Sequence, residues 1–212
     1  MSTEVAGEYQ LVPHRDRRSN WGGTASLIYS SFEPVYYEPN FFAGNFEDIY
    51  SSSDLPLIEI VIERKRNYAF GSVGVQFGFS GYQNDSDSPD LVDSSLLLLP
   101  IRLGVTVAFD NLTPEARFVP YLSAGAYTVV YREELAGNSY NGNTQLAPYF
   151  HGGLAISVDW IDRKAARISY EDSGIESSYV FVEARKQLAS AQSSDPDFES
   201  DVHFAGGIRV EY

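Results

Sequence analysis

The chain has 212 residues, a formal net charge of -14 and no cysteine, with 15 tyrosines and 13 phenylalanines against a single methionine. The acidic balance excludes nucleic-acid binding through a basic stripe, and the absence of cysteine excludes disulfides, thiolate metal centres and thiol catalysis. The longest apolar run, "LLLLPI", is interrupted by Pro100 and falls short of the roughly 18–20 residues of a membrane-spanning helix. The start "MSTEVAGEYQ" does not have the pattern of a secretory signal peptide, and the abundance of Tyr, Phe and Val predicts a β-rich chain.

Alternation with a period of two marks the candidate strands. It is clearest in "SVGVQFGFS", where Val73, Val75, Phe77 and Phe79 alternate with serine, glycine and glutamine. The second side of a soluble strand normally carries charged residues or threonine. Small polar residues instead suit the crowded interior of a narrow barrel, with the apolar side facing lipid. The predicted strands cover 22–30, 57–63, 72–80, 95–109, 119–131, 149–160, 177–185 and 202–212.

The number and length of these strands predict the fold class. Eight is an even number, and a strand of a membrane barrel needs roughly 9–11 residues to cross. We therefore predict an all-β, eight-stranded, antiparallel, up-and-down transmembrane β-barrel over residues 21–212, preceded by a periplasmic segment over residues 1–20. The alternation is less clear over 22–30, 57–63 and 177–185, and it is broken near Leu96 and Leu98, which fall on the otherwise polar side of their strand.

The connections support one orientation of this barrel. Short connections at 64–67 and 110–117 are predicted to be periplasmic turns, because short and long connections alternate in such a barrel, and the basic clusters at 15–18, 64–66 and 163–167 fall on the same side. The connection 161–176 is too long for a turn, and either a short helix or an extended strand end would explain it. The predicted external loops are 32–56, 82–94, 132–146 and 187–201, two of which carry the acidic stretches "NDSDSPD" and "SSDPDFESD".

The last strand, "VHFAGGIRVEY", alternates up to a terminal aromatic residue. It resembles the C-terminal assembly signal of bacterial outer-membrane β-barrel proteins, with tyrosine in place of the usual phenylalanine. The stretches "VPYLSAGAY" and "GGLAISVDW" are similar to strands of small barrels of the OmpW and OmpX kind. The resemblance implies a bacterial outer-membrane location and recognition by the barrel-assembly machinery. The predicted signal residues are Gly206, Ile208, Val210 and Tyr212.

The interior of an eight-stranded barrel is just wide enough to be filled by side chains, so no open pore is predicted. The charged residues on the inward side are both acids and bases, and buried charges require such partners. We interpret them as a mutually satisfying polar network. Its predicted members are Glu59, Glu63, Arg102, His151, Asp159, Glu183, Arg185, His203, Arg209 and Glu211.

Catalysis is an alternative, because some small barrels modify lipid A with serine, histidine and an acid. The candidate sets are His151 with Ser157, and His203 with Glu199 or Asp201. The His-x-Ser-Asn signature of lipid A deacylase barrels is absent, and "HRDRRSN" has these residue types at a different spacing. We therefore predict no catalytic residue and no cofactor.

A metal site is not predicted either. The acidic loop offers Asp85, Asp87 and Asp90, whose oxygen atoms are of the kind that Ca²⁺ prefers, but it lacks the glycine and the distal glutamate of an EF-hand loop. Divalent ions could still bridge such a loop to the phosphates of lipopolysaccharide.

The stretch "FEPVYYEPNFFAGNFEDIY" is unusually aromatic. Exposed aromatic surface on this scale predicts contact with lipid, with a partner or with a second copy in a homo-oligomer. The predicted contact residues are Phe32, Tyr36, Tyr37, Phe41, Phe42, Phe46 and Tyr50.

The predicted function is non-enzymatic. We expect a structural, adhesive or lipid- and envelope-interacting role, with membrane lipid and lipopolysaccharide as partners. The alternatives are a lipid A-modifying enzyme and, from the resemblance to OmpW alone, transport of small hydrophobic solutes. A soluble lipocalin-like barrel would have the opposite arrangement, with apolar residues inside and polar residues outside.

Overall fold

A computed structural model describes residues 12–32, 34, 36–37, 57–85, 94–135, 137–192 and 195–212. It contains two helices and nine strands in that part of the chain. The strands are β1 Trp21–Ser30, β2 Leu57–Asn67, β3 Ser72–Asp85, β4 Ser94–Ala108, β5 Phe118–Leu135, β6 Asn138–Asn143, β7 Ala147–Ser157, β8 Ser177–Gln187 and β9 His203–Glu211.

The strands form one closed antiparallel sheet. Each strand pairs with its neighbours in the order β4-β3-β2-β1-β9-β8-β7-β5, and a further pairing of β4 with β5 closes the ring. β6 and β7 both pair with β5, along different parts of its length, so they occupy one strand position. The chain is therefore an eight-stranded barrel, which confirms the predicted fold class.

The predicted alternation sets which side chains face inward. Along β2, Glu59, Val61 and Glu63 are buried while Ile60 and Ile62 between them are exposed. Buried and exposed side chains also alternate along most of β3 and β8, because successive side chains of a strand point to opposite faces of the sheet. The interior is thus the polar side of most strands.

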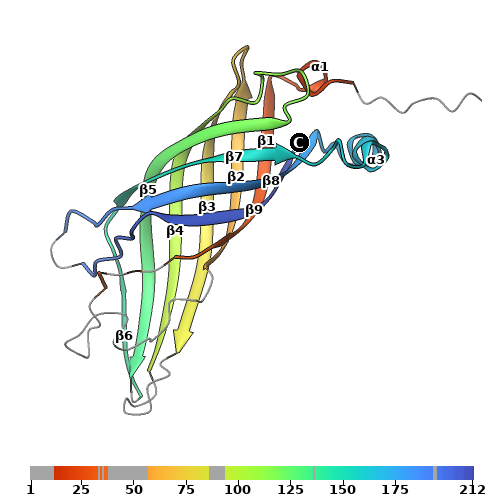
Figure 1. Cartoon of the computed structure of the whole chain (residues 1–212). Coiled ribbons are helices and arrows are strands. Elements are labelled where there is room, and N and C mark those ends of the chain that lie inside the picture. The colour runs from red at the N-terminus through yellow and green to blue at the C-terminus, as the bar shows by residue number, and fades with distance from the viewer. Residues whose placement is uncertain are drawn as a thin grey trace, which may run out of the picture.

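The barrel has two unlike ends (Figure 1). We call one the turn end; it carries residues 12–20, the connections 68–71, 109–117 and 158–176, and Tyr212. At the opposite end, the loop end, β3, β4, β5 and β6 extend beyond the other strands. β6 lies within the predicted loop 132–146, because the β5 hairpin continues its ladder from Val130 to Leu135.

Two helices lie at the turn end (Figure 1). α1 is a single turn, His14–Arg17, and α3 spans Arg163–Ser173. The Asp162 side chain caps the start of α3 by accepting from Ala165 N, and Gly174 ends it in the left-handed conformation. The 161–176 connection therefore holds a helix. Neither of these helices is long and apolar enough to cross a membrane.

Candidate functional site

The centre of the barrel is crossed by an ion-pair network that links opposite walls. Glu59 on β2 accepts from Arg185 Nη1 on β8 at 2.7 Å through Oε2, and its Oε1 pairs with Arg102 Nε on β4. Arg185 Nε also donates to Glu183 Oε1 at 2.5 Å. Because both carboxylates are almost fully buried, the two arginines supply the charge partners that they need.

His151 extends this network toward β5 and β3. Its Nδ1 lies 2.9 Å from Glu183 Oε2, and its Nε2 lies 3.1 Å from Gln76 Nε2. These contacts fit a ring that donates from Nδ1 and accepts at Nε2. Gln76 also donates to Tyr149 Oη at 2.9 Å, and Tyr121 Oη donates to Glu183 Oε2 at 2.6 Å. The middle of the lumen is therefore filled by bonded side chains.

Small residues on the inward side make room for these long side chains. A Cβ at Gly78 would lie 2.7 Å from Arg102 Nε and 2.5 Å from Glu59 Oε1. Glycine is required there because the ion pair packs directly against the β3 backbone. This explains why the inward side of "SVGVQFGFS" has no bulky residue.

Toward the loop end the interior changes from polar to aromatic. The Tyr37 and Phe198 rings stack with centroids 5.1 Å apart, and Tyr37 Oη donates to Glu133 Oε2 at 3.1 Å. This outer core closes the loop end of the lumen with apolar side chains. Its buried members are Phe32, Tyr37, Leu57, Tyr82, Leu96, Leu98, Tyr127, Val129, Tyr131, Ala147, Tyr149 and Phe198.

At the turn end, Asp110 and Glu211 share one lysine. Lys65 Nζ lies 2.9 Å from Asp110 Oδ2 and 2.5 Å from Glu211 Oε1. Asp110 also accepts from Arg18 Nη1 at 2.8 Å and from Ser72 Oγ at 2.7 Å. These charged and hydrogen-bonded side chains fill the turn end of the lumen.

The N-terminal segment, residues 12–20, lies across this end. Arg15 Nε donates to Asn111 Oδ1 at 2.8 Å, and Arg17 Nη2 donates to the backbone oxygen of Glu176. His14 points inward, with Nε2 at 3.3 Å from Glu211 Oε2. Burial raises the pKa of the Glu176 carboxyl, and the charge of Glu211 raises it further, against the opposing effect of His14.

The structure places the predicted lumen residues in different regions. Asp159 lies outside the lumen on the rim of the turn end, where it accepts from Ser177 Oγ at 2.6 Å. His203 lies at the loop end, with its ring 5.8 Å from Phe32. The Arg209 guanidinium lies inside, 4.6 Å from the centroid of Tyr121. The other seven lie in the interior: Glu59, Glu63, Arg102, His151, Glu183, Arg185 and Glu211.

The candidate catalytic sets do not assemble in the described part of the chain. Ser157 Oγ lies 3.4 Å from Ser177 Oγ, and His151 pairs with Glu183 and Gln76. His203 Nδ1 contacts the backbone oxygen of Asp201 at 3.2 Å, while Glu199 pairs with Lys186.

The aromatic contact prediction needs a partial correction. Phe32 and Tyr37 are buried in the outer core because they cover Tyr82 and Phe198, whereas Tyr36 is exposed. Phe41, Phe42, Phe46 and Tyr50 lie outside the described residues.

The predicted signal residues Gly206, Ile208, Val210 and Tyr212 run along the outward side of the last strand, in register with β1 and β8. Their role in assembly stays a prediction.

Sequence reasoning missed several residues that hold the network together. Lys65 has the same parity as Glu59 and Glu63 on β2, so the alternation could have assigned it to the lumen. The alternation also places Gln76 on the inward side of β3, but Asp110 and His14 had no such signal, because they lie outside the strands and their partners come from distant parts of the chain.

Comparison with known proteins gives structural similarity only. No protein-family model and no curated protein sequence matches the chain. Ail, the attachment invasion locus protein of Yersinia pestis, is 9% identical with a TM-score of 0.47, covering 92% of this chain and all of Ail. The N-terminal β-barrel domain of Pseudomonas aeruginosa OprF is 10% identical with a TM-score of 0.46, covering 92% of this chain and 98% of that domain. Neisserial surface protein A is 12% identical with a TM-score of 0.43, with the same coverage. At these values the similarity says nothing about function.

Proposed function

We propose that the chain is a bacterial outer-membrane β-barrel protein with a non-enzymatic role. In this proposal the closed barrel anchors the extended ends of β3, β4, β5 and β6 (Figure 1), which we call the projecting sheet, at the cell surface. One observation carries this proposal: the barrel has its charged side chains inside and its large apolar side chains outside. A soluble barrel requires the reverse, because apolar side chains leave water on folding. An apolar wall around a polar interior suits a protein solvated by lipid.

The outer wall is apolar on most strands. Exposed aliphatic and aromatic residues occupy the outward positions of β1, β2, β3, β4, β5, β7, β8 and β9. They include Leu27, Ile60, Ile62, Val75, Phe77, Leu103, Val105, Leu122, Phe150, Val182 and Ile208.

An aromatic and basic cluster lies on the wall near the turn end, on β1, β2 and the connection 68–71. The guanidinium groups of Arg64 and Arg66 each lie 5.7 Å from the Trp21 ring, and Tyr68 stacks on Phe70. Amphipathic rings and arginines favour the boundary between hydrocarbon and water. We therefore assign the turn end to the periplasmic interface and the loop end to the cell exterior.

The filled interior argues against transport through the barrel. The network of Glu59, Arg102 and Arg185 blocks the middle, and the outer core blocks the loop end. Within the described part of the chain, the projecting sheet is available to partners outside the cell. Its edge strand, β6, pairs with β5 on one side and is exposed along most of its length.

Site-specific labelling tests the insertion and its orientation. Because the chain has no cysteine, Ser139→Cys on β6 and Glu115→Cys at the turn end each create a unique thiol on an exposed residue. On intact Gram-negative cells, a membrane-impermeant maleimide should label the first variant. It should label the second only after the outer membrane is opened. Equal labelling of both on intact cells, or recovery of the protein in a soluble fraction, would refute the proposal.

A planar bilayer experiment tests the closed interior. The purified protein should give no steady single-channel current, because every level of the lumen is occupied. Regular conductance steps from the wild-type protein would favour a transport role instead.

A further inference from the structure

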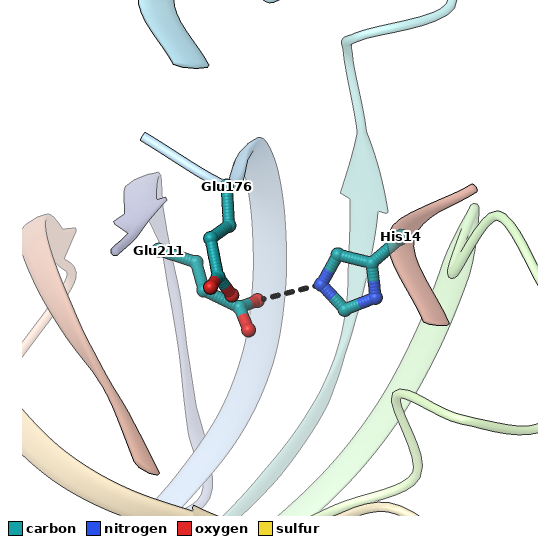
Figure 2. Close-up of side chains that lie close together, drawn as sticks. All are labelled: His14, Glu176 and Glu211. Carbon is teal, nitrogen blue, oxygen red and sulfur yellow. Dashed lines mark ion pairs between the residues drawn. The ribbon is translucent and has the colours of Figure 1, made fainter. Parts of the chain in front are cut away.

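Three buried side chains from distant parts of the chain meet at the turn end. His14 comes from α1, Glu176 directly precedes β8, and Glu211 is the last residue of β9. Figure 2 shows the imidazole and the two carboxyl groups directed toward one another. One ligand atom from each lies within 4.8 Å of the other two, and the residues are 1 %, 8 % and 1 % exposed.

Hydrogen bonding leaves this cluster incomplete. Among the described residues, His14 Nδ1 and Glu176 Oε2 have no hydrogen-bond partner, and His14 Nε2 has only the 3.3 Å ion-pair contact with Glu211 Oε2. Polar atoms buried in this way normally bond to a partner from the protein, to water or to an ion. Glu211 is held in place separately, by Lys65 at Oε1 and by Tyr179 Oη at 3.2 Å from Oε2.

Charge in this region also favours a cation. The carboxylates of Glu176, Glu211 and Asp110 outnumber the two cations, Lys65 and Arg18, that pair with Glu211 and Asp110. Arg17 is directed to Asp159 and to the backbone of Glu176, so it does not neutralise the Glu176 carboxyl. Burial of two carboxylates side by side is costly without a positive charge between them.

We infer that His14, Glu176 and Glu211 form a binding site for a divalent transition-metal cation of the Zn²⁺ type. One imidazole nitrogen with two carboxylate oxygens is a donor set that Zn²⁺ accepts, with water completing its coordination. Bonds of about 2.0–2.2 Å would require the three groups to draw together when the ion binds. The ion would fasten residues 12–20 to β8 and β9 and so stabilise the closed turn end.

Calorimetric titration of the purified full chain in detergent with Zn²⁺ tests this inference. The matched variants are His14→Ala and Glu176→Gln, with His203→Ala at the loop end as the histidine control. The wild type and the control should bind a single Zn²⁺ with the same affinity. Both site variants should bind at least about tenfold more weakly, because even the loss of residues that only orient metal ligands has effects of this size.

A second readout separates binding from a change in folding. Zn²⁺ should slow trypsin cleavage after Arg15, Arg17 and Arg18 in the wild type and in His203→Ala, but not in His14→Ala or Glu176→Gln. The gel-mobility shift on heating reports that each variant still forms its barrel. No Zn²⁺ binding by the wild type, or equal affinity in all four proteins, would overturn the inference. Equal affinity in all four proteins would mean that the ion binds to surface carboxylates instead. No binding by the wild type would mean that Glu176 carries a proton and the cluster holds no metal.

Discussion

Gly23 and Tyr212 exchange two backbone hydrogen bonds, Gly23 N to Tyr212 O at 2.7 Å and Tyr212 N to Gly23 O at 3.0 Å. The bonds extend the ladder of β1 with β9, which joins the first strand to the last. The Tyr212 ring lies directly over Gly23, so that a Cβ there would be 2.8 Å from two ring atoms. The terminal aromatic residue therefore covers the strand that closes the barrel.

Substituting Gly23 should weaken this closure. Gly23→Ala displaces the Tyr212 ring and should lower the free energy of unfolding by about 1 kcal/mol, near the low end for overpacking because the ring can move outward. Urea titration of the heat-sensitive gel band measures the effect. Gly81→Ala is the control, since its Cβ would meet only Leu99, at 3.9 Å. An equal loss in both variants would mean that the ring contact is irrelevant.

Tyr212→Asp should abolish assembly into the outer membrane, because the proposed assembly signal ends on an aromatic residue and a charge on the outward side opposes lipid. Tyr36→Asp, at an exposed position of a loop, is the control. The amount of each protein in purified outer membranes is the measurement. Wild-type levels of Tyr212→Asp would contradict the signal.

Glu59→Gln should destabilise the barrel strongly. The substitution leaves Arg102 without its carboxylate and removes one of the two partners of Arg185, and breaking a buried pair in this way costs about 3–5 kcal/mol. Glu134→Gln breaks the exposed pair with Arg132 and should cost at most about 1 kcal/mol. Urea unfolding of both variants in detergent decides the matter. Similar stabilities would show that the lumen network contributes little.

Phe198→Ala should open the outer core without opening the barrel. It removes the ring that packs against Tyr37 and Tyr131 and leaves a cavity beside them. We expect faster proteinase K cleavage between residues 188 and 200, with an unchanged gel shift on heating. Tyr36→Ala, whose side chain is exposed, should leave the cleavage rate unaltered. Unchanged cleavage of Phe198→Ala would argue against a packed loop end.

The sequence predicted which side chains form the wall of the barrel better than it predicted how the interior side chains pack against one another. Strand parity alone assigns Glu59 and Arg102 to the interior, because successive side chains point to opposite faces. Parity places Leu96 and Leu98 on the same inward side, and both are buried there, but the expectation that inward residues are polar fails because both are apolar. The apolar residues fit there because the interior becomes aromatic toward the loop end. The parity of one strand predicts which side a residue faces, but it does not predict this change in character along the barrel axis.

Contacts between distant segments could not be predicted. Tyr37 and Phe198 are far apart in the sequence, and a pattern within one strand contains no information about which of its loop residues will stack on which. His14 and Glu211 lie near opposite ends of the chain and meet only because barrel closure brings the last strand to the turn end. Such pairs form only when the barrel closes. A periodic pattern predicts that the barrel closes, but it does not predict which distant residues then come into contact.

The central claim is a closed barrel with a lipid-facing wall. The most direct test is to purify the protein in mild detergent, compare boiled with unboiled samples on an SDS gel, and then remove the detergent. The account predicts a heat-dependent change in mobility, followed by loss of solubility when detergent is withdrawn. A protein that shows no mobility change and stays monomeric in plain buffer would contradict it, because its exposed apolar rows would then have to be a soluble core.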